Sequence, residues 1–161
     1  MGTDESILDI IPNASRKKGW LKRQTWNLVF TNRRMIAALL TDQVVKAEAA
    51  NAAQAAQAQR ADALDRLWST AIAGVNLHKK YLSMPADQIL AENPQNFSVE
   101  LSQIASVKTA AGAMVQAGKW DPDTLTIRTA IEKMEFQLGF RSVSAGEATT
   151  ILRPIIRNRV K

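Results

Sequence analysis

Five cationic side chains and one tryptophan lie close together near the start of the chain. They are Arg16, Lys17, Lys18, Trp20, Lys22 and Arg23. No acidic residue interrupts the stretch from 13 to 25. Lys and Arg bind phosphate groups as point charges or as planar forks, and Trp suits the headgroup layer of a membrane. The stretch therefore predicts a site for anionic headgroups. The alternative is a solvated loop that keeps a sheet edge soluble.

Two more arginines lie at the centre of "NLVFTNRRMIAALLT", residues 27 to 41. This segment has the pattern of a hairpin, with a bend at Asn32-Arg33. Arg33 and Arg34 either keep the turn soluble or assist the first cluster. Because Arg33 is at the turn tip and Arg34 begins a strand, at most one can share a face with those cations, and we include Arg33 as a candidate ligand.

Other residues argue against catalysis. The chain has no cysteine and one histidine, His78, which we expect to be a packed or solvated helix residue. Triads and imidazole metal sites need more than this. Asp121 and Asp123 flank Pro122, but a hard cation requires more oxygen ligands. No glycine-rich phosphate loop is present. We predict no enzymatic activity, no cofactor, no metal and no small-molecule substrate.

The overall composition is that of a folded chain with a basic surface. Its 161 residues are 46% hydrophobic and carry a formal net charge of +6, which favours anionic partners. No apolar run could cross a bilayer, and the acidic N-terminus does not have the pattern of a signal peptide. We expect a cytoplasmic protein, peripheral to the membrane if it binds lipid. Nucleic acid is disfavoured because the cations lack interleaved aromatic residues.

The elements that must position these residues begin with a segment at 3–11 whose apolar residues suit either a helix or a strand, and Pro12-Asn13 should end it. Residues 13–24 are then expected to be a loop. From 25 to 31 the period is two, with Trp26, Leu28 and Phe30 on one face and polar residues on the other. The strand at 35–41 is apolar on both faces, which predicts a cover on its second face.

Residues 42–82 contain no proline and are rich in Ala, Gln and Leu, which favours a long helix. Such a helix can pair with a second copy or pack back over the strand at 35–41. After Pro85, strand-like segments follow at 89–93, 96–100 and 102–109, the last with an irregular start. A loop at 110–123 precedes a hairpin around Ala130. Ser144 and Glu147 form a capping box that opens a final helix, which Pro154 should kink or restart. Its cationic tail suits a helix C-terminus.

This order of elements, with "LVFTNRRMI" (28–36) and "NFSVELSQIASVK" (96–108), resembles the pleckstrin-homology-like (PH-like) domains of the GRAM and bacterial types. The resemblance implies an α+β fold: a seven-stranded antiparallel barrel or sandwich with a C-terminal helix. Here one domain would span 1–161, with the helical segment 42–84 inserted after the third strand. In such domains the first inter-strand loop often binds lipid headgroups, and residues 16–23 take that place here.

The prediction is a non-enzymatic binding or scaffold module that contacts anionic lipid headgroups through the basic stretch. The alternative is an oligomeric structural protein that assembles through residues 42–82 without binding lipid.

Overall fold

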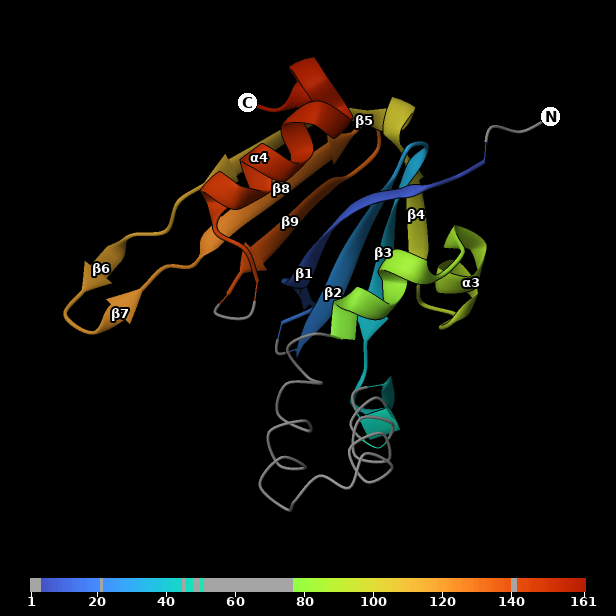
Figure 1. The fold of residues 1–161 in the computed structure, drawn as a ribbon. Helices are drawn as coiled ribbons and strands as arrows, with labels where there is room; N and C mark the ends of the chain where they lie inside the picture. The colour runs from blue at the N-terminus through green and yellow to red at the C-terminus, as the bar shows by residue number, and fades with distance from the viewer. Residues whose placement is uncertain (1–3, 21, 45, 48–49, 51–76, 140–141) are drawn as a thin grey trace, which may run out of the picture.

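Seven antiparallel strands form one curved, open sheet, and a C-terminal helix packs across one of its faces (Figure 1). The computed structural model describes residues 4–20, 22–44, 46–47, 50, 77–139 and 142–161. The strand order is β4-β3-β2-β1-β9-β8-β5. The predicted α+β class, antiparallel pairing and C-terminal helix are confirmed.

The strands fall into two groups that share β1 (Ile7–Lys18). On one side of β1 lie β2 (Lys22–Thr31), β3 (Arg34–Leu40) and β4 (Phe97–Glu100). On the other side lie β9 (Lys133–Leu138), β8 (Asp123–Thr129) and β5 (Ile104–Ala110). A separate ribbon of β6 (Met114–Gln116) and β7 (Lys119–Trp120) leaves the body between β5 and β8, within the segment predicted as a loop (Figure 1).

β1 continues through Pro12 and Asn13, where the sequence predicted its end. These residues form a bulge between the pairs Ile11–Leu28 and Ala14–Trp26. Asn13 has a φ of 52°, and its N–H donates to Asn27 Oδ1 at 3.1 Å. A bulge accepts proline because no ladder donor is needed there, and it bends the strand. After the bend β1 pairs with β9 as well as with β2.

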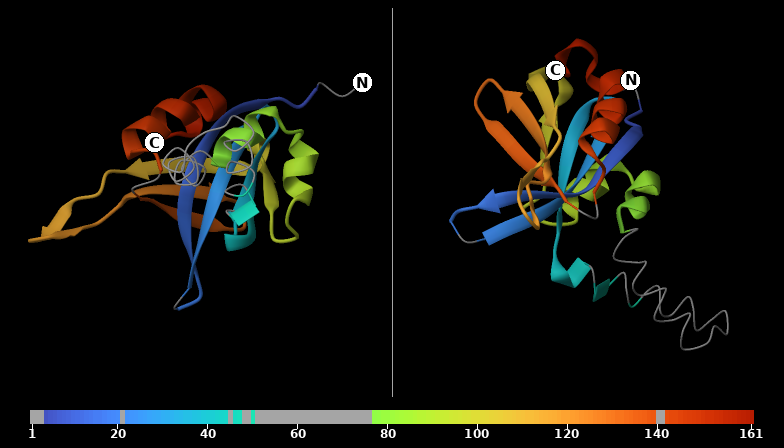
Figure 2. Two further views of the ribbon diagram at one scale, coloured as in Figure 1. Left: turned by 60° about the horizontal axis from the view of Figure 1, so that its bottom comes forward. Right: turned by 90° about the vertical axis from the view of Figure 1, so that its left-hand side faces the viewer.

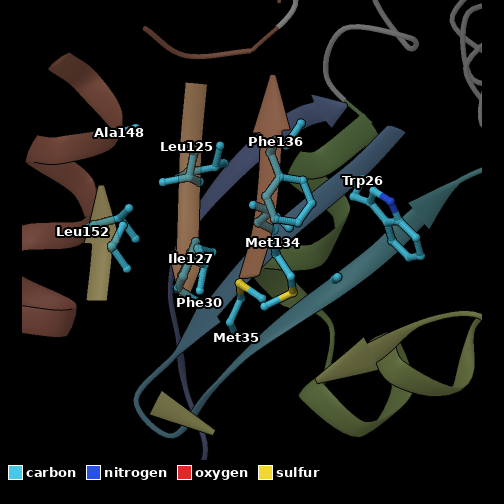
Figure 3. Close-up of a cluster of buried hydrophobic side chains, with 14 of the residues drawn as sticks. Trp26, Phe30, Met35, Leu125, Ile127, Met134, Phe136, Ala148 and Leu152 are labelled. Atoms are coloured by element: carbon cyan, nitrogen blue, oxygen red, sulfur yellow. The ribbon is translucent and has the colours of Figure 1, made fainter. Parts of the chain in front are cut away.

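The main core fills the inner side of the sheet (Figure 3). Trp26, Leu28 and Phe30 of β2 all point into it, as predicted. Helix α4 (Ala145–Ile156) covers the core with Ala148 and Leu152. The Ser144–Glu147 capping box is present. The helix runs through Pro154 to Ile156, so this proline neither ends nor restarts it. Two short 3-10 turns, η2 (Leu101–Gln103) and η3 (Arg157–Arg159), lie near the end of the helix.

A second, smaller core lies behind β2 and β3. Ile36 and Ala38 contact Tyr81 of η1 (Leu77–Ser83) and Ile89 of α3 (Ala86–Ala91). The predicted cover on β3 is therefore confirmed, and it comes from residues 77–91. Asn27 and Thr31, which we expected on a polar face, are also buried. The strand predicted at 89–93 is wrong, because that segment belongs mainly to α3.

Several local predictions are confirmed. The irregular start of β5 lies between Ile104 and Ser106, and β8 and β9 form the hairpin around Ala130. Residues 42–44, 46–47 and 50 are helical, and residues 77–82 belong to the 3-10 helix η1. The rest of the long helix predicted at 42–82 lies outside the described residues. Within the described part, no helix is both long and apolar enough to cross a membrane.

Candidate functional site

The basic stretch is the tip of a long β-hairpin, so the loop predicted at 13–24 is wrong. β1 and β2 stay paired as far as Lys18 and Lys22. The turn between them includes Gly19, whose φ is +67°, and Trp20. Both strands extend past the body of the sheet, and the hairpin projects from the molecule (Figure 2). The bulge at Pro12-Asn13 explains the error, because it allows β1 to resume after a strand-ending dipeptide.

Strand alternation divides the five cations between two faces. Residues directly opposed in an antiparallel pair lie on the same face. Lys17 opposes Arg23 on the outer face, the side away from the main core. Arg16, Lys18 and Lys22 share the inner face with Ala14 and Trp26. Arg16, Lys17 and Arg23 line one groove, whereas Lys18 and Lys22 do not, so the predicted ligands do not all meet in one pocket.

Arg16 belongs to the rim of the main core. It forms an ion pair with Glu132, and its guanidinium carbon lies 6.0 Å from the centre of the Phe136 ring. Its side chain is only 29% exposed. A guanidinium that stacks on an aromatic ring and pairs with a carboxylate has much of its charge already neutralised. Arg16 therefore contributes to packing more than to an open anion site.

The outer face adds cations that the sequence prediction did not include. Lys17, Arg23 and Ser15 border a groove whose other wall is β9, with Lys133, Glu135 and Gln137. Lys133 and Glu135 also line a second hollow on the outer face. That hollow extends over β8 and β5 and includes Lys108, Thr126 and Arg128. The signal was present in the alternation of 124–129 and 132–138, which places Arg128 and Lys133 outward together.

Three like-charged pairs oppose each other on neighbouring strands, two of them on the outer face and the Lys18–Lys22 pair on the inner face of the hairpin. Lys17 opposes Arg23, Lys18 opposes Lys22, and Arg128 opposes Lys133. Like charges directly opposed on neighbouring strands destabilise a sheet. Within the described residues, none of the first four cations forms an ion pair, and Arg23 Nη1 has only a long contact of 3.5 Å to Ser15 Oγ. Lys133 has Glu135 at 3.5 Å. The surface thus holds a positive charge that the chain itself leaves largely unbalanced.

Trp20 is an exposed residue of the hairpin turn, with 92% of its surface accessible. It lies in the turn next to the Lys18–Lys22 pair. An indole ring buries a large apolar area in a core or an interface and keeps an N–H donor for a polar partner. At the hairpin tip it makes no such use of its apolar area within the described residues, so the tip combines an accessible aromatic ring with unbalanced cations.

Arg33 is far from this cluster, contrary to its inclusion among the candidate ligands. β2 has ten residues and joins the two bends, so at about 3.3 Å per residue they are roughly 30 Å apart. Arg33 is exposed at the β2–β3 turn. Arg34 instead holds Glu5 with two bonds of 2.9 Å and also contacts Asp87. This bend contributes to the fold.

The Arg34–Glu5 pair is electrostatically satisfied. Burial alone would raise the pKa of Glu5, but hydrogen bonds from Arg34 and from Thr31 Oγ1 outweigh it and lower that pKa. The hydrogen bond to Glu5 in turn raises the pKa of the Arg34 guanidinium. The Arg34 and Glu5 side chains are 15% and 14% exposed. Neither group is free to receive a ligand.

The other residues that the sequence offered for catalysis or metal binding occupy structural positions. His78 is a half-buried residue of η1. Asp123 Oδ2 and Oδ1 accept the N–H groups of Ala145 at 2.7 Å and Gly112 at 2.8 Å, and these bonds lower its pKa. No cluster of three metal-ligating side chains occurs among the residues that the structure describes.

Comparisons with models of protein families, with curated proteins and with solved structures give no match to this chain. Its functional interpretation therefore comes from the hairpin and the surface beside it.

Proposed function

We propose that this chain is a non-enzymatic, PH-like binding module that docks on anionic membrane surfaces through the β1–β2 hairpin. The observation that carries this proposal is the pair of like-charged contacts at the tip, Lys17 with Arg23 and Lys18 with Lys22, beside the exposed Trp20. An anionic surface would relieve the repulsion between these cations. The antiparallel sheet and its C-terminal helix support the PH-like assignment at the level of fold class.

The groove beside the hairpin supports the same function. Lys133 and Arg128 extend the positive surface from Lys17 and Arg23 across β9 and β8. Each Lys or Arg near an anionic bilayer contributes about 1 kcal/mol of binding free energy, and salt screens this attraction within roughly a Debye length. Four hairpin cations therefore supply up to about 4 kcal/mol at low salt. This suffices for reversible peripheral binding, which is consistent with a binding or scaffold role.

Vesicle co-sedimentation tests the proposal. The wild-type chain should sediment with phosphatidylserine-containing vesicles, more strongly at low than at physiological ionic strength, and not with phosphatidylcholine vesicles. A variant with Lys17, Lys18, Lys22 and Arg23 all changed to Ala should lose binding by about three orders of magnitude at low salt. Unchanged retention of this variant would show that the hairpin is not the lipid site.

The alternative of assembly through residues 42–82 concerns a segment that lies mostly outside the described residues. Light scattering of a chain with 42–76 replaced by a short linker tests it, because an unchanged oligomeric state would remove that alternative. Residues 77–91 should be kept, since they cover β3.

A further inference from the structure

The β6–β7 ribbon also projects from the body of the described chain (Figure 1). It pairs with no strand of the main sheet. Met114 and Trp120 oppose each other directly and are 58% and 66% exposed. An isolated two-stranded ribbon is only marginally stable in water. Its largest described apolar side chains therefore contribute little to the core and are available to a partner.

The root of the ribbon is nevertheless firmly built. Asp121 N–H donates to the Ala113 carbonyl at 2.9 Å, and Gly112 N–H donates to Asp123 Oδ1 at 2.8 Å. A Cβ on Gly112 would lie 1.8 Å from the Asp121 carbonyl oxygen, so only glycine allows this close approach. The other oxygen of Asp123 holds the first residue of α4. These contacts fix where the ribbon leaves the body.

The two hairpin tips can touch one flat surface. In the left view of Figure 2 both tips lie on the outline, and the rest of the described chain lies on one side of the line that joins them. A plane through that line meets the β1–β2 and β6–β7 tips together. The β1–β2 tip carries the exposed Trp20, and the β6–β7 ribbon carries the exposed Trp120 between its turn and its root. Tryptophan is enriched at membrane–water interfaces because its ring is apolar and its N–H is polar.

We propose that the β6–β7 ribbon is a second membrane-contact element, in which Met114 and Trp120 enter the interfacial layer of the bilayer that the β1–β2 hairpin binds. This inference rests on the proposed function and adds a second site to it. The ribbon has Lys119 and Asp121 on either side of Trp120, so these charges cancel. Its contribution is therefore apolar and insensitive to salt, whereas the hairpin's contribution is electrostatic.

Fluorescence quenching by brominated phospholipids locates Trp120 directly. The Trp20→Phe/Trp68→Phe variant keeps Trp120 and Trp26, and a matched variant that also carries Trp120→Phe keeps Trp26 alone. Trp26 is 5% exposed in the core and supplies the background. With brominated phosphatidylserine vesicles, we expect quenching and a blue shift in the first variant that the second lacks. Circular dichroism verifies that both variants are folded.

A second measurement separates the two tips. Met114→Ala/Trp120→Ala should weaken vesicle binding by about tenfold, from the lost apolar area, and leave its salt dependence unchanged. If the Trp20→Phe/Trp68→Phe variant sediments with the vesicles while Trp120 is not quenched, this inference is wrong and the proposed function stands. If the chain binds no vesicles, both are wrong. Loss of a wild-type dimer in the double variant, with Trp120 unquenched, would instead make the ribbon an interface between two copies.

Discussion

The two ends of β2 carry similar sequences and have opposite roles. The Lys17–Arg23 end and the Arg33-Arg34 end are both short basic segments at bends of the same strand. Arg34 is enclosed by Glu5, Thr31 and Asp87, so its charge is used within the fold. Lys17 and Arg23 oppose each other without an acidic partner among the described residues. Local composition does not distinguish them, whereas the carboxylates brought by distant segments do.

The largest expected effect on stability is at the Arg34 end. Arg34→Ala removes two charged hydrogen bonds and leaves the Glu5 carboxylate with its Thr31 bond and only the Coulombic attraction of Arg33. Because both side chains are mostly buried, we expect a loss of about 2–3 kcal/mol in the free energy of unfolding. Urea denaturation measures it. Arg33→Ala is the matched control, and a loss as large in this variant would contradict the distinction between neighbouring arginines.

The same ion pair should make stability depend on acid. The pKa of Glu5 is lower in the folded chain than in the unfolded one. The ion pair's contribution to the free energy of unfolding is therefore complete above the pKa of about 4.3 that Glu5 has in the unfolded chain. This contribution is lost as the pH falls through the lower pKa of the folded chain.

Glu5→Gln should flatten this part of the pH–stability profile without affecting vesicle binding at pH 7. Thermal unfolding measured at a series of pH values below 5 compares the two chains. Parallel profiles would show that Glu5 does not titrate with the fold.

Removing cations from the β1–β2 hairpin should stabilise the fold or leave its stability unchanged, in contrast to the loss expected for Arg34→Ala. Lys17→Ala/Lys18→Ala removes one member of each like-charged pair. Cross-strand terms are about 0.2–1 kcal/mol each, so the variant should be as stable as wild type or slightly more stable. Urea denaturation detects the change. A loss above 1 kcal/mol would mean that these cations serve the fold, as Arg34 does.

The smallest effect on stability is expected at Arg16. This residue is intermediate between Arg34, which is paired within the fold, and the cations of the hairpin tip, which have no ion pair within the described residues. Its ion pair with Glu132 is partly exposed, and such pairs contribute about 0.2–1 kcal/mol. Arg16→Ala should lower stability by about that amount and reduce vesicle binding less than Lys17→Ala does. Equal binding losses in these two single variants would place Arg16 among the headgroup ligands.

Sequence patterns with a local cause were predicted well. The period of two in β2, the capping box at Ser144 and the hairpin around Ala130 all follow from neighbouring residues. The failures depend on distant partners. Pro12-Asn13 does not end β1 because Asn27, fourteen residues later, accepts the Asn13 N–H.

The candidate site shows the same division. Its basic composition was visible in residues 16–23, but the separation of Arg16 from Lys17 depends on strand register. Strand pairing also explains why Lys133 lies on the basic surface and Arg33 does not. β9, which contains Lys133, pairs with β1, whereas Arg33 lies in the turn at the opposite end of β2 from the hairpin tip. Neither fact can be read from the spacing of cations along the chain.

The most direct test of the central claim compares two variants that lose the same charge. Lys17→Ala/Arg23→Ala and Arg33→Ala/Arg153→Ala each remove two exposed cations, and each lowers the net charge by two. Binding to phosphatidylserine-containing vesicles at low salt should fall by about 30-fold in the first and by less than about threefold in the second. Equal losses in the two variants would show that net charge, and not the β1–β2 hairpin, governs the binding.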